Sequence, residues 1–227
     1  MKVSAKRFVP ILLVLGIVWL ALPVWGSDMS KDEETIRNAD TVLRAMVGSK
    51  DIPASVVAKA DCIVILPSVK KFAVGIGGTG GRGPMTCREG ADFSGKWGPP
   101  AMYSIGGASA GLQIGGTAKD YVVLVMTSTA ANKLLDGKVK VGSDATAAAG
   151  SGASASTSTT DMLTYSRTSG LFAGVSLDGA SLNPDSDANQ RLYGKAVSAR
   201  DIVGGQVKAT PAGQSLVSLL DSKAGKK

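Results

Sequence analysis

Apolar and polar positions follow a helical spacing in residues 27–47. Ser30 stands three residues before Glu33, which is typical of a capping box at a helix start, and Gly48 is suited to end the helix. The apolar positions recur three or four residues apart, at Ile36, Ala39, Leu43, Met46 and Val47. This pattern predicts one amphipathic helix.

The polar side of this helix leaves two functions open. Arg37 and Arg44 could contact anionic lipid if the helix lay on a membrane. The same stretch also carries carboxylates, at Asp32, Glu33, Glu34 and Asp40. Because these acids dilute the positive charge, the pattern favours a helix that covers the core of its own domain.

Short apolar runs and glycines mark the strands that follow. Residues 62–66 are wholly apolar, as in a strand buried on both faces, and Pro67 is expected to end it. Residues 72–83 predict a glycine-dense strand and turn. Residues 121–126 predict a second doubly buried strand.

The most informative strand pattern is in residues 101–118. Its apolar face changes parity at Gly106 and Gly107, which predicts a bulge or sharp bend there. Long, bent strands of small residues build barrels or strongly coiled sheets. We therefore expect one α+β domain, a β-rich antiparallel barrel-like sheet with short helices packed on it. Further helices are predicted at 52–59, 128–135, 187–193 and 211–220, and further strands at 145–160, 162–167 and 171–177.

The N-terminal residues have the composition of a signal peptide. Lys2, Lys6 and Arg7 precede the apolar run 10–22, and cleavage is expected after Gly26. An uncleaved membrane anchor is the alternative. It is disfavoured because a spanning helix needs about 20 apolar residues.

Cleavage divides the chain into a signal peptide at 1–26, a domain at 27–222 and a disordered basic tail at 223–227. The protein is then expected to be periplasmic or secreted. Removing three of the 25 Lys and Arg leaves 22 cations against 18 Asp and Glu, a net charge of +4. This mild positive charge suits an anionic membrane. Without a dense basic stripe, it predicts no nucleic-acid partner.

The sequence offers little to a catalytic or metal site. It contains no histidine, the commonest general base and metal ligand, and no G-x-S-x-G nucleophile elbow. Asp185-x-Asp187-x-Asn189 begins like a calcium loop, but Gln190 and Ala196 stand where that loop needs Gly and Glu. We expect no enzyme activity, no cofactor and no metal, and a helix cap at Asp185 or Ser186.

Cys62 and Cys87 are the two cysteines of the chain. In a compartment outside the cytoplasm, such a pair predicts a disulfide. Two buried free thiols are the alternative, because the spacing alone does not bring the sulfurs together.

Several distinctive stretches occur in a fixed order. They are Ile52-Pro53 with Ala58-Lys59-Ala60, Gly77-Gly78-x-Gly80-Gly81-x-Gly83, Gly95-x-Trp97-x-x-Pro100, Gly111-x-Gln113-x-Gly115-Gly116, Tyr165-Ser166-x-x-x-Gly170-Leu171-Phe172-Ala173-Gly174 and Asn189-x-x-x-Tyr193-Gly194. In this order they resemble the SYLF domain family over about residues 35–220.

The resemblance implies a lipid-binding domain, because eukaryotic relatives are associated with phosphoinositides and with actin at membranes. This chain departs from them in its predicted signal peptide, which would put actin out of reach. It also departs in its lack of an SH3 or FYVE domain and in its partly acidic first helix. We expect an anionic phospholipid or membrane surface as partner, with an envelope protein-interaction or structural module as the alternative.

The glycine-rich segment near residue 80 is the candidate head-group site. Gly75-x-Gly77-x-x-Gly80 has the letters of a dinucleotide fingerprint, but Gly83-Pro84 follows where that fold needs a helix. Positive-φ glycines could instead form a backbone nest for an anion. The flanking cations that would join in binding a phosphate head group are Lys70, Lys71 and Arg82.

Trp97 precedes Pro99 and Pro100 and has two interpretations. It could be an interfacial membrane anchor, because tryptophan concentrates at that depth. It could equally be a buried plug of its loop.

Overall fold

The computed structural model describes residues 25–74, 76–110, 115–137, 139–141, 161–167 and 180–225. Its helices are α1 (Trp25–Gly48), α2 (Ala54–Val57), α3 (Ser128–Asp136), α4 (Ser186–Tyr193), α5 (Ala199–Val203) and α6 (Pro211–Ala224). Its strands are β1 (Cys62–Val74), β2 (Ile76–Cys87), β3 (Ala101–Ala110), β4 (Gly115–Val125), β5 (Val139–Val141), β6 (Met162–Arg167) and β7 (Ala180–Pro184). The stretches predicted as strands at 145–160 and 171–177 lie outside the described residues, as do residues 1–24.

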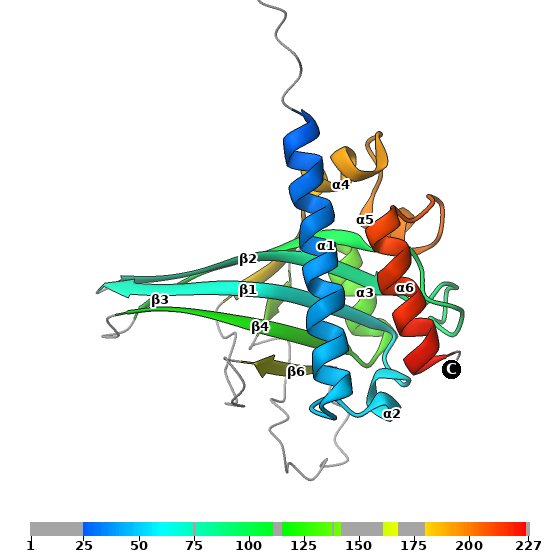
Figure 1. The fold of residues 1–227 in the computed structure, drawn as a ribbon, viewed down its shortest axis with the longest axis horizontal. Helices are drawn as coiled ribbons and strands as arrows, with labels where there is room; N and C mark the ends of the chain where they lie inside the picture. Colours follow the sequence, from blue (N-terminus) through cyan, green and yellow to red (C-terminus); the bar gives the residue numbers. More distant parts are fainter. Residues whose placement is uncertain are drawn as a thin grey trace, which may run out of the picture.

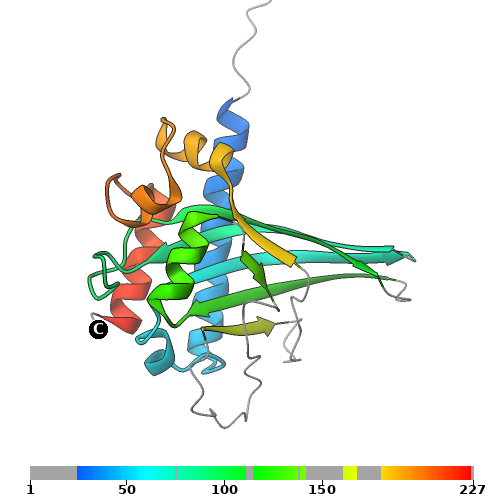
Figure 2. The ribbon, with the colours of Figure 1, turned by 180° about the vertical axis from the view of Figure 1, so that it is seen from behind.

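The strands form one seven-stranded sheet in the order β5-β7-β3-β2-β1-β4-β6, and all its neighbours are antiparallel. The sheet curls into a half-barrel with α1 and α6 across one face and α3 on the other, as Figures 1 and 2 show. The predicted α+β class and barrel-like antiparallel sheet are confirmed.

The central strands β1 and β4 alternate between two cores. Ile63 and Ile65 pack with α1 and α6 on the outer face, whereas Val64 and Leu66 pack with α3 and α5 inside the curl. All four side chains are fully buried, which stabilises the fold by about 1.5–3 kcal/mol for each. The prediction of doubly buried strands at 62–66 and 121–126 is confirmed.

Helix α1 covers the outer core. Its predicted apolar positions Ile36, Ala39, Leu43 and Met46 are at most 1% exposed. The helix begins at Trp25, so Ser30 lies inside it and the expected capping box at Ser30 is wrong. The interpretation as a helix over its own domain's core is confirmed.

Pro67 does not end β1, contrary to prediction. The register of β1 against β4 shifts between Leu66 and Val69, and Ser68 takes a positive φ of 51°. Asp120 accepts a hydrogen bond from the Ser68 N–H at 2.9 Å. This irregularity accommodates the proline, and the strand continues to Val74.

The bulge expected at Gly106 and Gly107 is also absent. These residues pair with Gly80 and Thr79 of β2 without a register shift. The segment 101–118 is not one bent strand but contains all of β3 and the start of β4. The parity change at 106–107 falls inside β3, which stays in register with β2 through both glycines. Residues 111–114, between β3 and β4, lie outside the described part.

Three short elements, β5, β7 and α5, were not predicted, because none is long enough to show a period. Trp97 is 1% exposed, so the interpretation as a membrane anchor is wrong and the buried plug is correct. Helix α6 runs to Ala224, two residues into the segment expected to be a tail.

Candidate functional site

Strands β1 to β4 project well beyond the helices as a four-stranded sheet (Figure 1). We call residues 68–74, 76–81, 106–110 and 115–120 the sheet extension. Glycine lets its strands pack closely: a Cβ on Gly81 would lie 2.9 Å from Cγ2 of Val69. The extension is thus a thin, closely paired sheet that presents surface on both faces.

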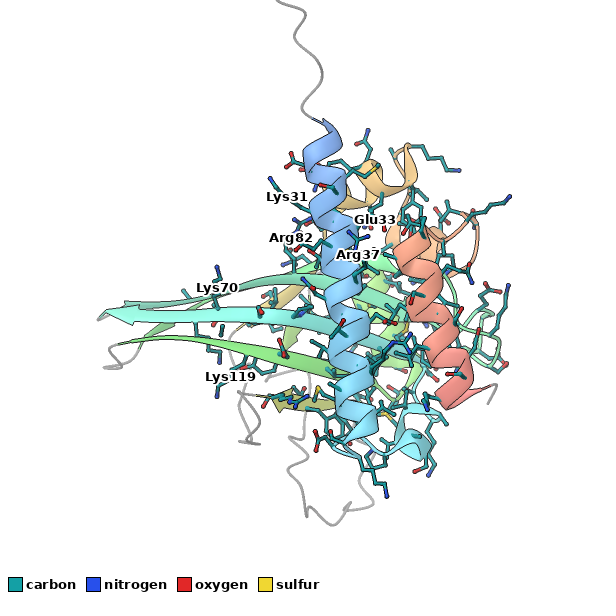
Figure 3. The ribbon with its side chains drawn as sticks, in the orientation of Figure 1. Lys31, Glu33, Arg37, Lys70, Arg82 and Lys119 are labelled. Atoms are coloured by element: carbon teal, nitrogen blue, oxygen red, sulfur yellow. A yellow bond between two sulfur atoms is a disulfide. The ribbon has the colours of Figure 1, made fainter. Side chains whose placement is uncertain are left out.

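Two of the predicted head-group residues lie on this extension. Lys70 is exposed and pairs in register with Gly80 and Ala118, and Lys71 follows it on the other face of β1. Figure 3 shows Lys70 pointing away from the sheet, well clear of α1. The structure therefore leaves Lys70 exposed on one face of the extension and places Lys71 on the opposite face.

Lys119 on β4 was missed by sequence reasoning. It pairs in register with Val69, one residue from Lys70 along β1 (Figure 3). The available signal was its place as the first charged residue after the charge-free segment 101–118. With Lys70 and Lys71 it makes three lysines on adjacent strands.

Among the described residues of the sheet extension, only one is acidic. Asp120 is that residue, and it accepts the Ser68 N–H. The extension is therefore a basic surface, and we call Lys70, Lys71 and Lys119 the lysine collar.

Arg82, the third predicted head-group residue, does not join the collar. Its Nη2 donates to Oδ1 of Asp32 at 2.7 Å and its Nε to Oδ2 of Asp185 at 2.8 Å. Arg191 Nε donates to Oδ2 of the same Asp32 at 2.8 Å. Asp32 is fully buried, and its hydrogen bond raises the pKa of Arg191. These four residues, the arginine–aspartate cluster, fasten α1 to β2 and α4.

The glycines between the collar and Arg82 do not form the expected backbone nest. Residues 77–83 are extended strand: all of them pair with β3, and residues 77–80 also pair with β1. Their amides are therefore engaged in the sheet. The head-group role of the lysines stays a prediction that rests on their side chains.

The two helix arginines are paired within α1. Arg37 lies 3.5 Å from Glu33 and Arg44 lies 2.7 Å from Asp40, both one turn earlier. Both guanidinium groups remain about half exposed. The structure brings neither of them to the lysine collar.

The predicted disulfide is confirmed. Cys62 and Cys87 face each other in register on β1 and β2 and are bonded, and both are fully buried. Their burial on the inner face of the sheet gives the bond a structural role.

Arg88 follows the disulfide and is almost wholly buried. Its guanidinium donates to the carbonyls of Ala58, Ala60, Gly95 and Ala224, and it lies 4.4 Å from the centre of the Trp97 ring. Burial lowers its pKa, because a charged guanidinium is costly away from water. Arg88 therefore ties the end of α6 to α2 and is a structural residue.

Other kinds of site were sought in the described part of the chain. No group of three or more Cys, Asp or Glu there could hold a metal ion. None of the helices described is both long enough and apolar enough to cross a membrane.

Comparison with known proteins adds a family match. Residues 106–223, just over half of the chain, match the Ysc84 family, described as Las17-binding protein actin regulator. The human SH3 domain-containing YSC84-like protein 1 is 30% identical over 203 residues, which are 86% of this chain and 58% of that protein. The Schizosaccharomyces pombe SH3 domain-containing protein PJ696.02 is 33% identical over 193 residues, which are 79% of this chain and 43% of that protein. LAS seventeen-binding protein 3 of Saccharomyces cerevisiae is 29% identical over 182 residues, which are 76% of this chain and 39% of that protein. The chain spans less than two thirds of each of these relatives.

Proposed function

This chain belongs to the Ysc84 family, the SYLF-domain family that its sequence resembles, and we propose that it is a non-catalytic protein that binds anionic phospholipid at a membrane surface. The observation that carries this proposal is the lysine collar on the projecting sheet extension. The names of its relatives describe binding and regulation, which suits a role without catalysis.

The arrangement of charge along the extension favours contact through its free end. No charged residue stands between Lys71 and Arg82 or between Ala101 and Lys119 in the sequence. Lys70 and Lys119 each lie four residues from the strand end, about 13 Å along the sheet. Lysines behind a charge-free end suit a membrane, because they reach the head groups while the uncharged end approaches the acyl region.

The faces from which the three lysines project also favour contact through the free end of the extension. Val69 belongs to the inner core, so its partner Lys119 and the next-but-one residue Lys71 project from the inner face. Lys70 projects from the opposite face. Flat adsorption through one face would leave part of the collar unused, whereas an end-on approach brings all three lysines to the surface.

The expected strength follows from the number of lysines. Each contributes about 1 kcal/mol near an anionic surface, so the collar contributes about 3 kcal/mol, or roughly a hundredfold in affinity. Salt screens such attractions over about 8–10 Å at 0.1–0.15 M. Binding is therefore expected to fall as salt rises.

We further propose that the protein works in the periplasm or outside the cell. The support is the signal-peptide pattern of residues 1–26 together with a disulfide, which persists in oxidising compartments. Mass determination of the N-terminus of protein recovered from the producing cells tests this: a chain that starts at Ser27 supports it, and an uncut Met1 terminus argues against it.

Co-sedimentation with liposomes tests the lipid proposal. Residues 27–227 are mixed with neutral vesicles or with vesicles containing anionic phospholipid, each at low and high salt. The proposal expects pelleting with anionic vesicles only, and release at high salt. Equal pelleting with neutral vesicles, or retention unchanged by salt, would contradict the electrostatic mechanism.

A protein partner is the second candidate function. The family description and the name of LAS seventeen-binding protein 3 support it, since both specify binding to a protein. The description also names actin regulation, and the argument against actin rests on the predicted signal peptide alone. Failure to pellet under every condition, with cross-linking to an envelope protein, would favour this candidate.

A further inference from the structure

A groove is lined by residues from the N-terminal part of α1, the end of α4 and the start of α6. Figure 1 shows where these three helices lie. Its volume is about 560 Å³, within the usual range for small-molecule sites. Residues 206–211, which lead into α6, form one wall. None of the lysine collar lines this groove, so it is separate from the sheet extension.

The groove has an apolar floor beside polar side chains. Leu192, Tyr193, Val207 and Pro211 contribute to it. Met29 of α1 also lines the groove. Its relative exposure to solvent is 46%, and among the described residues it is the one large hydrophobic residue that is exposed. Such a side chain, left open to water beside other apolar surface, suits a ligand with a hydrocarbon part.

Three polar side chains at the groove, those of Tyr193, Thr210 and Glu33, are already satisfied. The Tyr193 hydroxyl donates to the Pro100 carbonyl at 2.5 Å, and the Thr210 hydroxyl accepts from the Gly213 N–H. Glu33 accepts the Ala212 N–H at 3.2 Å and pairs with Arg37, so the N-terminus of α6 already has its anion. A ligand in the groove would therefore meet the apolar side chains and the Gln206 amide there.

Two cations at the groove do lack a partner in the described part of the chain. Lys195 and Lys208 are both exposed, and neither forms an ion pair with any residue that the structure describes. With Glu33 paired to Arg37, the charge at the groove is positive. Apolar floor and cationic rim together match a molecule that has a hydrocarbon tail and an anionic head.

We propose that this groove binds a single-chain anionic amphiphile, such as a fatty acid, with the tail against Met29 and Val207 and the carboxylate at Lys195 and Lys208. This is a second site, for a single dissolved molecule, and it does not depend on membrane adsorption by the lysine collar.

Calorimetric titration of the purified protein with dodecanoate, below its micelle concentration, tests the proposal. Dodecanol and acetate are the reference ligands, since each carries only one half of the chemistry. The proposal expects one dodecanoate per protein and at least tenfold weaker binding of both references. Equal binding of dodecanol or acetate, or no dodecanoate binding, would overturn it.

The location is tested with two charge-matched variants. Loss of both lysines in Lys195→Gln/Lys208→Gln is expected to weaken dodecanoate binding by about 25-fold, from about fivefold for each charge. Lys59→Gln/Lys133→Gln removes two exposed lysines outside the groove and is expected to bind as the parent does. Equal losses in the two variants would refute the site, even if dodecanoate binds. Methyl NMR shifts at Met29 on titration provide a readout that is independent of charge.

Discussion

The arginine–aspartate cluster supplies the sharpest prediction about stability. Asp32 is fully buried and accepts from two arginines, and Arg82 and Arg191 retain 38% and 24% of their side-chain exposure. Removing one partner of a buried pair usually costs about 3–5 kcal/mol, because the remaining charge is left uncompensated. Since water reaches both arginines in part, we expect Asp32→Asn to lower the free energy of unfolding by about 2–3 kcal/mol. That loss corresponds to a decrease of roughly 5–10 °C in Tm for a chain of this size.

Urea unfolding followed by circular dichroism measures this change. Asp28→Asn is the matched control, since Asp28 lies one turn earlier on α1 and pairs with Lys31 while both side chains are about half exposed or more. The control is expected to unfold as the parent does. If Asp32→Asn changed stability no more than Asp28→Asn, the cluster would not fasten α1 to the sheet, and the reasoning would be refuted.

Two further predictions concern the core around the disulfide. Arg88→Met is expected to destabilise the protein by about 3 kcal/mol, because it leaves the carbonyls that the guanidinium binds without a donor, and an unchanged urea midpoint would contradict this role. Reduction of the Cys62–Cys87 bond is expected to cost about 3 kcal/mol, since the oxidised bond closes a loop across a sequence separation of 25. Urea unfolding of the reduced and oxidised forms measures it, and coincident curves would show that the bond adds no stability.

Much of the fold could be predicted from local signals. The apolar period of α1, the doubly buried runs of β1 and β4, and the cap at Asp185 each depend on residues close in sequence. The Asp185 side chain accepts the Ala188 N–H at 3.0 Å, as a helix cap should. The disulfide was predictable from the single pair of cysteines together with the expected compartment outside the cytoplasm.

The errors have a common physical origin. Pro67 would end a strand in most contexts. Here the register of β1 against β4 shifts between Leu66 and Val69, and the strand continues past the proline. Gly106 and Gly107 predict a bend, but β3 stays paired with β2 in one register through both residues. Both outcomes depend on pairing with distant strands, which a local pattern does not contain.

Among the predicted site residues, too, local sequence identified those on the exposed extension but could not reveal the distant partners of Arg82. Lys70 and Lys71 are predicted head-group residues because they flank the glycine-rich segment, and both lie on the sheet extension. Arg82 was chosen on the same ground, but its partners Asp32 and Asp185 are 50 and 103 residues away in sequence. Only the fold brings such residues together.

The central claim is that the lysine collar binds an anionic membrane, and a charge-matched liposome comparison tests it most directly. Lys70→Gln/Lys119→Gln and Arg37→Gln/Arg44→Gln each remove two positive charges, the first pair from the sheet extension and the second from α1. The account predicts that the sheet variant loses roughly 30-fold in affinity for anionic vesicles, from about 1 kcal/mol for each lysine, while the helix variant binds nearly as the parent does. Equal losses in both variants would show that net charge alone attracts the protein, and a loss confined to the helix variant would place the contact on α1; either result would contradict the account.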